Sequence, residues 1–207
     1  MTVSSMHCCK SAAEPVRRSR WLLVVLALIC LPLHARAGTI EPVSAHLSAG
    51  DNSYLLSAEF KVELGPHLEE AVSRGMPLYF LLEFNLTRNR WYWANEHIAS
   101  KTINYRLSYD ALTRQYRLAN GPLYQNFASL GEALRVMSRV FALPVVAKSA
   151  VKEGDTYQAE LRLSLDRQQL PKPFQVDAIA NSDWQIDAQT LHWQFVPGAA
   201  DEGHAPK

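Results

Sequence analysis

Cysteine is confined to the first thirty residues of the chain. The three cysteines are Cys8, Cys9 and Cys30, and residues 31–207 contain none. This longer part therefore has no disulfide, no thiol nucleophile and no cysteine-bound metal. It must be held together by the burial of apolar side chains.

Motifs of several enzyme classes are missing as well. The sequence has no Gly-x-Ser-x-Gly elbow and no glycine-rich loop suited to cradling a phosphate. Its histidines show no His-x-His, His-x-x-x-His or His-Glu-x-x-His spacing, so we expect no metal site and no cofactor. The scattered histidines are His46, His67, His97 and His192.

A secretory signal peptide is predicted at residues 1–37. Arg17–Arg20 supply its positive segment, Trp21–Leu33 its apolar segment, and Ala35–Ala37 the small-x-small pattern of a signal peptidase site. The apolar segment is short for a membrane span, so we predict cleavage after Ala37, export to the periplasm and no remaining transmembrane span. The alternative is that the arginine-flanked segment stays as a membrane anchor.

Removal of this leader changes the charge of the chain. It takes away five of the 21 basic residues and one of the 20 acidic residues, so the net charge falls from +1 to −3. Global attraction to nucleic acid or to an acidic membrane is therefore not expected. Residues 38–198 are enough for a single β-rich domain, and the polar, proline-bearing residues 199–207 are predicted to be a flexible tail.

Alternation of apolar and polar residues is the clearest structural signal. In residues 53–64 it predicts a half-buried strand with Tyr54, Leu56 and Phe60 on the buried face. Residues 78–86 alternate too, but their second face is partly apolar, so this strand is expected to lie centrally in a sheet. Other strands are predicted at 103–109, 157–165 and 191–195, with a short hairpin at 116–127 around Asn120-Gly121-Pro122.

Two short helices are expected between the strands. Pro66 suits the first turn of a helix that ends before Gly75. Ser129 and Glu132 form a capping box for the second helix, whose apolar residues recur at helical spacing as far as Phe141. These helices are too few for the crossovers of a parallel sheet. We therefore expect a mainly β fold, an antiparallel β-sandwich or a curved sheet with two short helices.

Arginines and aromatic residues are concentrated between residues 88 and 117. Planar guanidinium groups can hold carboxylates or phosphates, and aromatic rings add stacking surface, so the region would suit an anionic ligand, a glycan or a protein partner. A structural role explains the pattern more readily. In that interpretation the region is a pair of strands with its rings inward and its arginines paired with Glu83, Glu96 or Asp110. The candidate binding residues are Arg88, Arg90, Trp91, Trp93, Arg106, Arg114 and Arg117.

A second candidate is the proline-bearing segment 170–175. Pro171 and Pro173 enforce an extended backbone, which would suit a rigid recognition loop using Lys172 and Phe174. The simpler interpretation is a connection between strands with Phe174 in the core.

Three segments together resemble a known family. They are residues 81–93 (LLEFNLTRNRWYW), 105–118 (YRLSYDALTRQYRL) and 165–176 (LDRQQLPKPFQV), the last followed by Ser182-Asp-Trp184. The family is an uncharacterised proteobacterial family of exported proteins, domain of unknown function 4390. The resemblance implies a Gram-negative envelope location and a gene neighbourhood near a membrane sensor kinase of the nitrogen-regulation type. It implies no activity and no catalytic residue, and a neighbourhood is only an associational indication of a partner.

The function we predict is a non-catalytic periplasmic binding or interaction domain. Its partner is expected to be a protein, membrane-bound in the envelope, or an anionic ligand. The alternative is a periplasmic hydrolase of an envelope polymer that works with two carboxylates. No pair is singled out by the sequence among Glu83, Glu96, Asp110 and Asp166.

Overall fold

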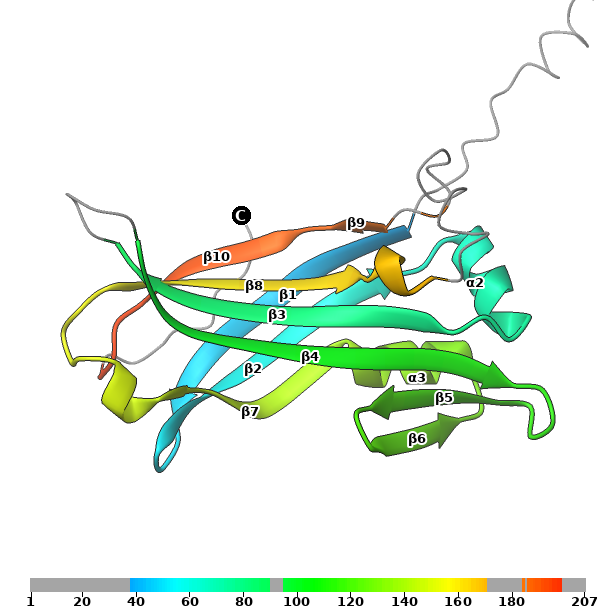
Figure 1. Cartoon of the computed structure of the whole chain (residues 1–207), viewed down its shortest axis with the longest axis horizontal. Helices are drawn as coiled ribbons and strands as arrows, with labels where there is room; N and C mark the ends of the chain where they lie inside the picture. Colours follow the sequence, from blue (N-terminus) through cyan, green and yellow to red (C-terminus); the bar gives the residue numbers. More distant parts are fainter. Residues whose placement is uncertain (1–37, 90–94, 171–183, 185, 199–207) are drawn as a thin grey trace, which may run out of the picture. The chain divides into compact units, whose positions relative to one another are not determined.

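Two β-sheets packed face to face make up the computed structural model, which describes residues 38–89, 95–170, 184 and 186–198 (Figure 1). Their facing sides share one cluster of buried apolar residues. The mainly β fold and its sandwich form are therefore confirmed. None of the helices in the described ranges is long and apolar enough to span a membrane.

The smaller sheet has four strands in the order β7-β2-β1-β9. Strands β1, β2 and β7 pair antiparallel, whereas the short β9 runs parallel to β1, which departs from the antiparallel arrangement expected. The strands span Gly38–Ala49 (β1), Ser53–Glu63 (β2), Arg139–Ala147 (β7) and Ile186–Ala188 (β9).

The larger sheet has six strands in the order β10-β8-β3-β4-β5-β6, and all of its pairs are antiparallel. Strand β3 lies between β8 and β4, so its predicted central position is confirmed. The chain crosses from one sheet to the other at Gln189, whose N–H donates to the Ile40 carbonyl at 3.0 Å. The strands span Leu78–Arg88 (β3), Glu96–Asp110 (β4), Gln115–Asn120 (β5), Leu123–Phe127 (β6), Tyr157–Leu165 (β8) and Thr190–Phe195 (β10).

Both predicted helices are present, as α2 (Pro66–Ser73) and α3 (Leu130–Met137), and short 3₁₀ turns occur at Lys148–Ala150 and Arg167–Gln169. Helix α2 begins at the predicted proline and buries the predicted stripe of Leu68, Ala71 and Val72. Helix α3 is capped as predicted: the Ser129 hydroxyl accepts the Glu132 N–H at 3.3 Å.

The predicted continuation of the second helix to Phe141 is wrong. Helix α3 ends at Met137 and strand β7 follows, with Phe141 and Ala142 together opposite Ser57 of β2 as a β-bulge. The Ala142 N–H donates to the Ser57 hydroxyl at 3.3 Å, and Ala142 has a left-handed φ of 49°. Because a bulge re-aims the local side chains, Phe141 projects into solvent with 90% of its surface exposed.

Strand β1 was not predicted, and a bulge explains why. The register of β1 against β2 shifts between Pro42 and Ser44, so Val43 is an extra residue in the strand. The buried positions before and after it, Ile40 and Ala45, therefore fall out of step with a period of two.

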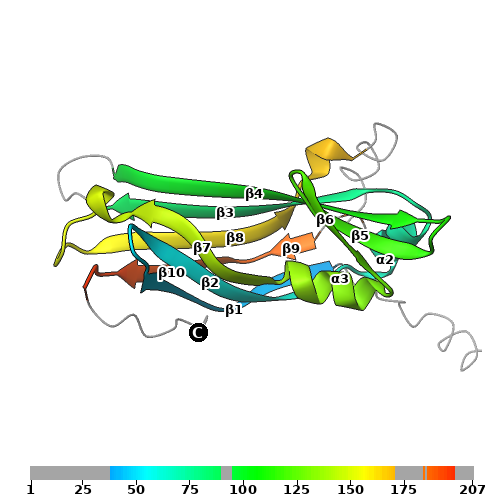
Figure 2. The ribbon, with the colours of Figure 1, turned by 90° about the horizontal axis from the view of Figure 1, so that it is seen from below.

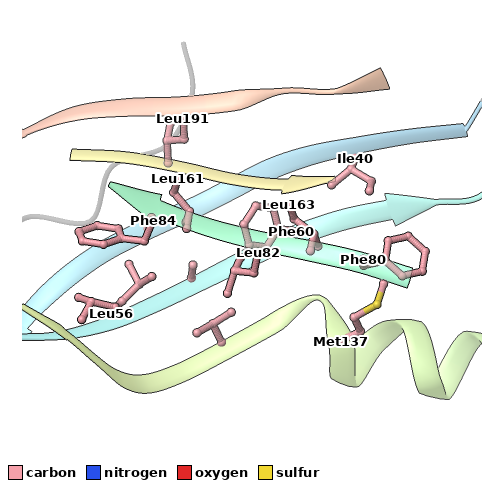
Figure 3. Close-up of a cluster of buried hydrophobic side chains, with 14 of the residues drawn as sticks. Ile40, Leu56, Phe60, Phe80, Leu82, Phe84, Met137, Leu161, Leu163 and Leu191 are labelled. Carbon is pink, nitrogen blue, oxygen red and sulfur yellow. The ribbon is translucent and has the colours of Figure 1, made fainter. Parts of the chain in front are cut away.

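The core lies between the sheets and is built from the alternating faces of β2, β3 and β8 (Figure 3). Met137 of α3 points toward Phe80 of β3 in this view, so the helix contributes to the same core. The rings of Tyr54 and Phe195 meet edge to face at 4.9 Å and join β2 to β10. Burial of each large apolar side chain contributes about 1.5–3 kcal/mol to stability.

The two sheets are unequal in width, and α3 covers part of the difference. Strand β7 at the edge of the smaller sheet contacts β4, while β5 and β6 extend the larger sheet beyond it. Helix α3 contacts β5, β6 and β7 and lies beside the overhanging hairpin (Figure 2).

Two leucines provide a test of the core. Leu56 is fully buried and Leu112 is 97% exposed. Leu56→Ala is expected to lower the free energy of unfolding by about 2–5 kcal/mol, because it leaves a cavity, whereas Leu112→Ala changes it by less than about 0.5 kcal/mol. Urea unfolding of both variants measures the difference. Equal losses would contradict the placement of β2 in the core.

Candidate functional site

Some of the predicted binding residues lie outside the described part of the chain. These are Arg90, Trp91 and Trp93, and the same holds for the leader 1–37, most of the proline-bearing segment (171–175) and the tail 199–207. The structure therefore bears on the remaining arginines, which are Arg88, Arg106, Arg114 and Arg117.

Arg88 is engaged by two carboxylates of the chain itself. It ends strand β3 with its side chain 25% exposed, and its guanidinium lies 2.5 Å from Glu96 and 3.0 Å from Asp155. Hydrogen bonds to Glu96 and then to Asp155 raise the pKa of Arg88 above its ordinary value. The network ties β3 and β4 to the loop before β8, so an incoming anion would have to displace both carboxylates.

The other arginines lie far from Arg88. In the β3–β4 pairing Arg88 is opposite Glu96 and Arg106 is opposite Tyr79, nine residues away along β3. At about 3.3 Å per residue this separates the two arginines by roughly 30 Å. Arg114 is exposed in the turn between β4 and β5. The structure thus divides the predicted zone instead of gathering it into one site.

Arg117 of β5 is held by its neighbours on the outer face of the sheet. Its side chain lies 3.6 Å from the Asp110 carboxylate, donates to the Asn126 side-chain oxygen at 3.2 Å and stacks over the Tyr124 ring at 4.9 Å. Such a cation–π contact fixes the position of an otherwise exposed ring. Arg117 therefore orients Tyr124 of β6.

The carboxylates considered for hydrolysis have separate structural surroundings. Glu96 pairs with Arg88, and Asp110 accepts the N–H of Leu112 at 3.0 Å in the β4–β5 turn. Asp166 accepts the Gln168 N–H at 3.0 Å, and Glu83 lies opposite Arg162 in the β3–β8 register. Among the described residues, no three of His, Cys, Asp and Glu are placed to hold a metal ion.

A groove opens where the overhanging hairpin, α3 and the start of β7 meet. Its volume is about 230 Å³. We call it the hairpin groove, and it is lined by Tyr105, Leu118, Asn120, Leu123, Tyr124, Gln125, Val136 and Arg139. A larger groove of about 560 Å³ lies beside α2, with His67, Glu70, Arg74, Met76 and Trp184 in its wall.

Exposed apolar side chains gather at the hairpin groove and not beside α2. Six large apolar side chains are exposed in the described ranges; three of these residues, from β6 and α3, line the groove, and a fourth is in β7. The fourth, Phe141, follows two residues after the lining residue Arg139, and the Tyr124 ring lies at the strand edge on the outer face of the sheet, over Arg117. We call these four the apolar rim: Leu123 (75% exposed), Tyr124 (62%), Val136 (44%) and Phe141 (90%).

Sequence reasoning did not find this surface. The sequence predicts Leu123 and Tyr124 in a hairpin without a role, and Phe141 on the apolar stripe of a helix. The sequence does contain one indication of an exposed edge. Residues Leu123–Phe127 follow a tight turn and mix apolar with uncharged polar residues, without the charge or proline that usually protects an edge strand.

The hairpin groove is lined by apolar and uncharged polar side chains and one arginine. No carboxylate is among the described residues that line it, and the lining Arg139 pairs with Glu59 at 3.0 Å. Burial raises the pKa of the Tyr105 phenol above its ordinary value of 10.0, so this hydroxyl is neutral at physiological pH. The groove offers apolar walls with phenol and amide hydrogen-bonding groups, a composition that suits recognition of another apolar surface.

The fold and this surface define the chain as a mainly β sandwich domain with exposed apolar side chains beside a groove. It belongs to the family described as "Domain of unknown function (DUF4390)", whose model matches residues 37–194. No curated protein and no solved structure matches the chain significantly.

The Arg88 network generates a stability prediction. Arg88→Gln is expected to lower the midpoint of thermal unfolding, because Glu96 and Asp155 lose their shared cation. Arg114→Gln, in an exposed turn, serves as the matched control and should leave the midpoint unchanged. Circular dichroism melts measure both. The difference between the two midpoints should shrink in about 1 M salt, because the screening length of charges is then only about 3 Å. Equal midpoints for the two variants at low salt would contradict a stabilising role of the Arg88 network.

Tyr105 generates a prediction for alkaline pH. Burial raises the pKa of Tyr105 in the folded chain above the ordinary value of 10.0. Its contribution to the free energy of unfolding is therefore fully present below pH 10.0 and is lost as the pH rises through the folded pKa. Tyr105→Phe should therefore lose less stability than the natural chain above pH 10.0. Unfolding free energies as a function of pH measure this, and parallel curves for the two proteins would refute it.

Proposed function

We propose that the chain is an exported, non-catalytic interaction domain of the periplasm, and that the hairpin groove with its apolar rim is its contact surface. The supporting observation is that three of the six exposed large apolar residues line one groove and a fourth, Phe141, lies two residues after Arg139 in its wall. Apolar surface left in water costs about 25 cal/mol per Å², and clustered exposed apolar side chains typically mark interaction sites.

A protein is the partner that this surface suits best. The groove, at about 230 Å³, is smaller than the roughly 300–1,000 Å³ of ordinary small-molecule pockets. The rim instead presents aromatic and aliphatic side chains of the kind that anchor protein interfaces. An anionic ligand fits less well, because Arg139 and Arg117 are already paired with Glu59 and Asp110. In the envelope, a membrane-bound protein would be such a partner.

Site-specific photo-crosslinking tests this proposal. A photo-reactive phenylalanine analogue is placed at Phe141 or Val136 in cells that express the full chain. We expect one discrete protein adduct in the envelope fraction from both positions, because both side chains lie on the rim.

Leu112 supplies the control for this experiment. It is more exposed than Phe141, but it lies in the β4–β5 turn away from the groove. The analogue at position 112 should not give the adduct, and Val136→Asp should abolish the adduct from position 141. Equal labelling from 112 and 141 would show nonspecific contact and contradict the proposal.

A further inference from the structure

Strand β6 differs from the other sheet edges in the described part of the chain. Edge strands expose unpaired backbone groups, and proteins block them with proline, charge, bulges, short length or a covering element. Strand β7 carries Pro144 and the bulge at Phe141, β9 has three residues, and β10 contacts β1 of the other sheet. Strand β6 is short, but it carries no proline, charge or bulge, and its register with β5 is unbroken over five pairs.

The register shows which backbone groups of β6 face outward. Gly121 and Pro122 form a two-residue turn, with Gly121 at φ 57°, so the flanking pair Asn120–Leu123 is hydrogen-bonded. Hydrogen-bonded and non-hydrogen-bonded pairs alternate along an antiparallel ladder. The N–H and C=O groups of Tyr124 and Asn126 therefore point away from β5, toward the open edge.

We propose that β6 pairs antiparallel with β6 of a second copy of this chain, about a two-fold axis at Gln125. Tyr124 then lies opposite Asn126 of the second copy, and the outward groups of both residues form four backbone hydrogen bonds. The two six-stranded sheets become one continuous sheet. This inference rests on the proposed interaction function, because Leu123 and Tyr124 belong to the apolar rim.

The composition of β6 fits a copy of itself. A two-fold interface brings the same surface against itself, so any charge near its axis would face a like charge. Residues 123–127 carry no charge. In the proposed register Leu123 lies opposite Phe127 of the second copy, which supplies an apolar neighbour for a side chain that is 75% exposed in the single chain.

The length of β6 sets the strength of the pairing. Pro122 precedes the strand and α3 begins three residues after it, so only five residues of each copy can pair. A standard interface uses about 20–30 residues a side. The dimer is therefore weak and forms in proportion to protein concentration.

A charge exchange at the two-fold axis tests the pairing. In the proposed register Gln125 faces itself, with Cβ atoms roughly 5 Å apart. Gln125→Lys and Gln125→Glu should each weaken dimerisation about fivefold, and an equal mixture of the two should restore it, because lysine then faces glutamate. Sedimentation velocity over a concentration series, with the chain as purified from the envelope, measures all three.

Gln194→Lys is the matched control. Gln194 is also an exposed glutamine on an edge strand, β10, and its substitution should leave dimerisation unchanged. Three results would each overturn the pairing. The natural chain could stay monomeric up to its solubility limit, or the mixture of Gln125 variants could dimerise no better than each variant alone. The third is that Gln194→Lys weakens dimerisation as much as the Gln125 variants do.

The two proposals fail separately. If the chain is monomeric but Phe141 still gives its envelope adduct, only the pairing is wrong. If the Gln125 variants behave as expected and no adduct forms at Phe141, the pairing of β6 is supported. The proposal that the apolar rim binds an envelope protein is then wrong.

Discussion

The difference in width between the two sheets is the constraint on which the rest of the structure depends. A six-stranded sheet faces a four-stranded one, so the inner faces of β5 and β6 lie beyond the reach of β7. Apolar residues there require another cover, and α3 provides it by burying Ala133 and Met137. One helix of eight residues cannot cover the whole overhang. The uncovered part is the hairpin groove, and the uncovered edge is β6.

The bulge in β7 adds to this surface at a local energetic cost. A non-glycine residue in the left-handed region, such as Ala142, is destabilised by about 1–2 kcal/mol. The hydrogen bond from its N–H to Ser57 and the regular pairs on either side hold it in place. The same distortion turns Phe141 outward, two residues after Arg139 in the wall of the groove. Strain that places an aromatic ring in solvent is consistent with a contact role for that ring.

The sequence predicts those parts of the fold whose signal is local and regular. Strands β2, β3 and β8 have an unbroken period of two, and α2 has a proline start and a three-residue apolar stripe. Strands β1 and β7 could not be recognised, because the bulges at Val43 and Phe141 shift the buried positions by one.

The candidate site was harder to predict, because it depends on which strands pair. Arg88 and Arg106 are close in sequence, yet the β3–β4 hairpin places them at opposite ends of the sheet. The apolar rim shows the reverse: Leu123, Val136 and Phe141 come from three elements that only the packing of α3 on the hairpin brings together. Amide hydrogen exchange, measured residue by residue at low and high protein concentration, tests the account most directly. We predict that the Tyr124 and Asn126 amides are protected only at high protein concentration, while the Gln125 amide, which bonds to β5, is protected at both. Rapid exchange of Tyr124 and Asn126 at every concentration would contradict it.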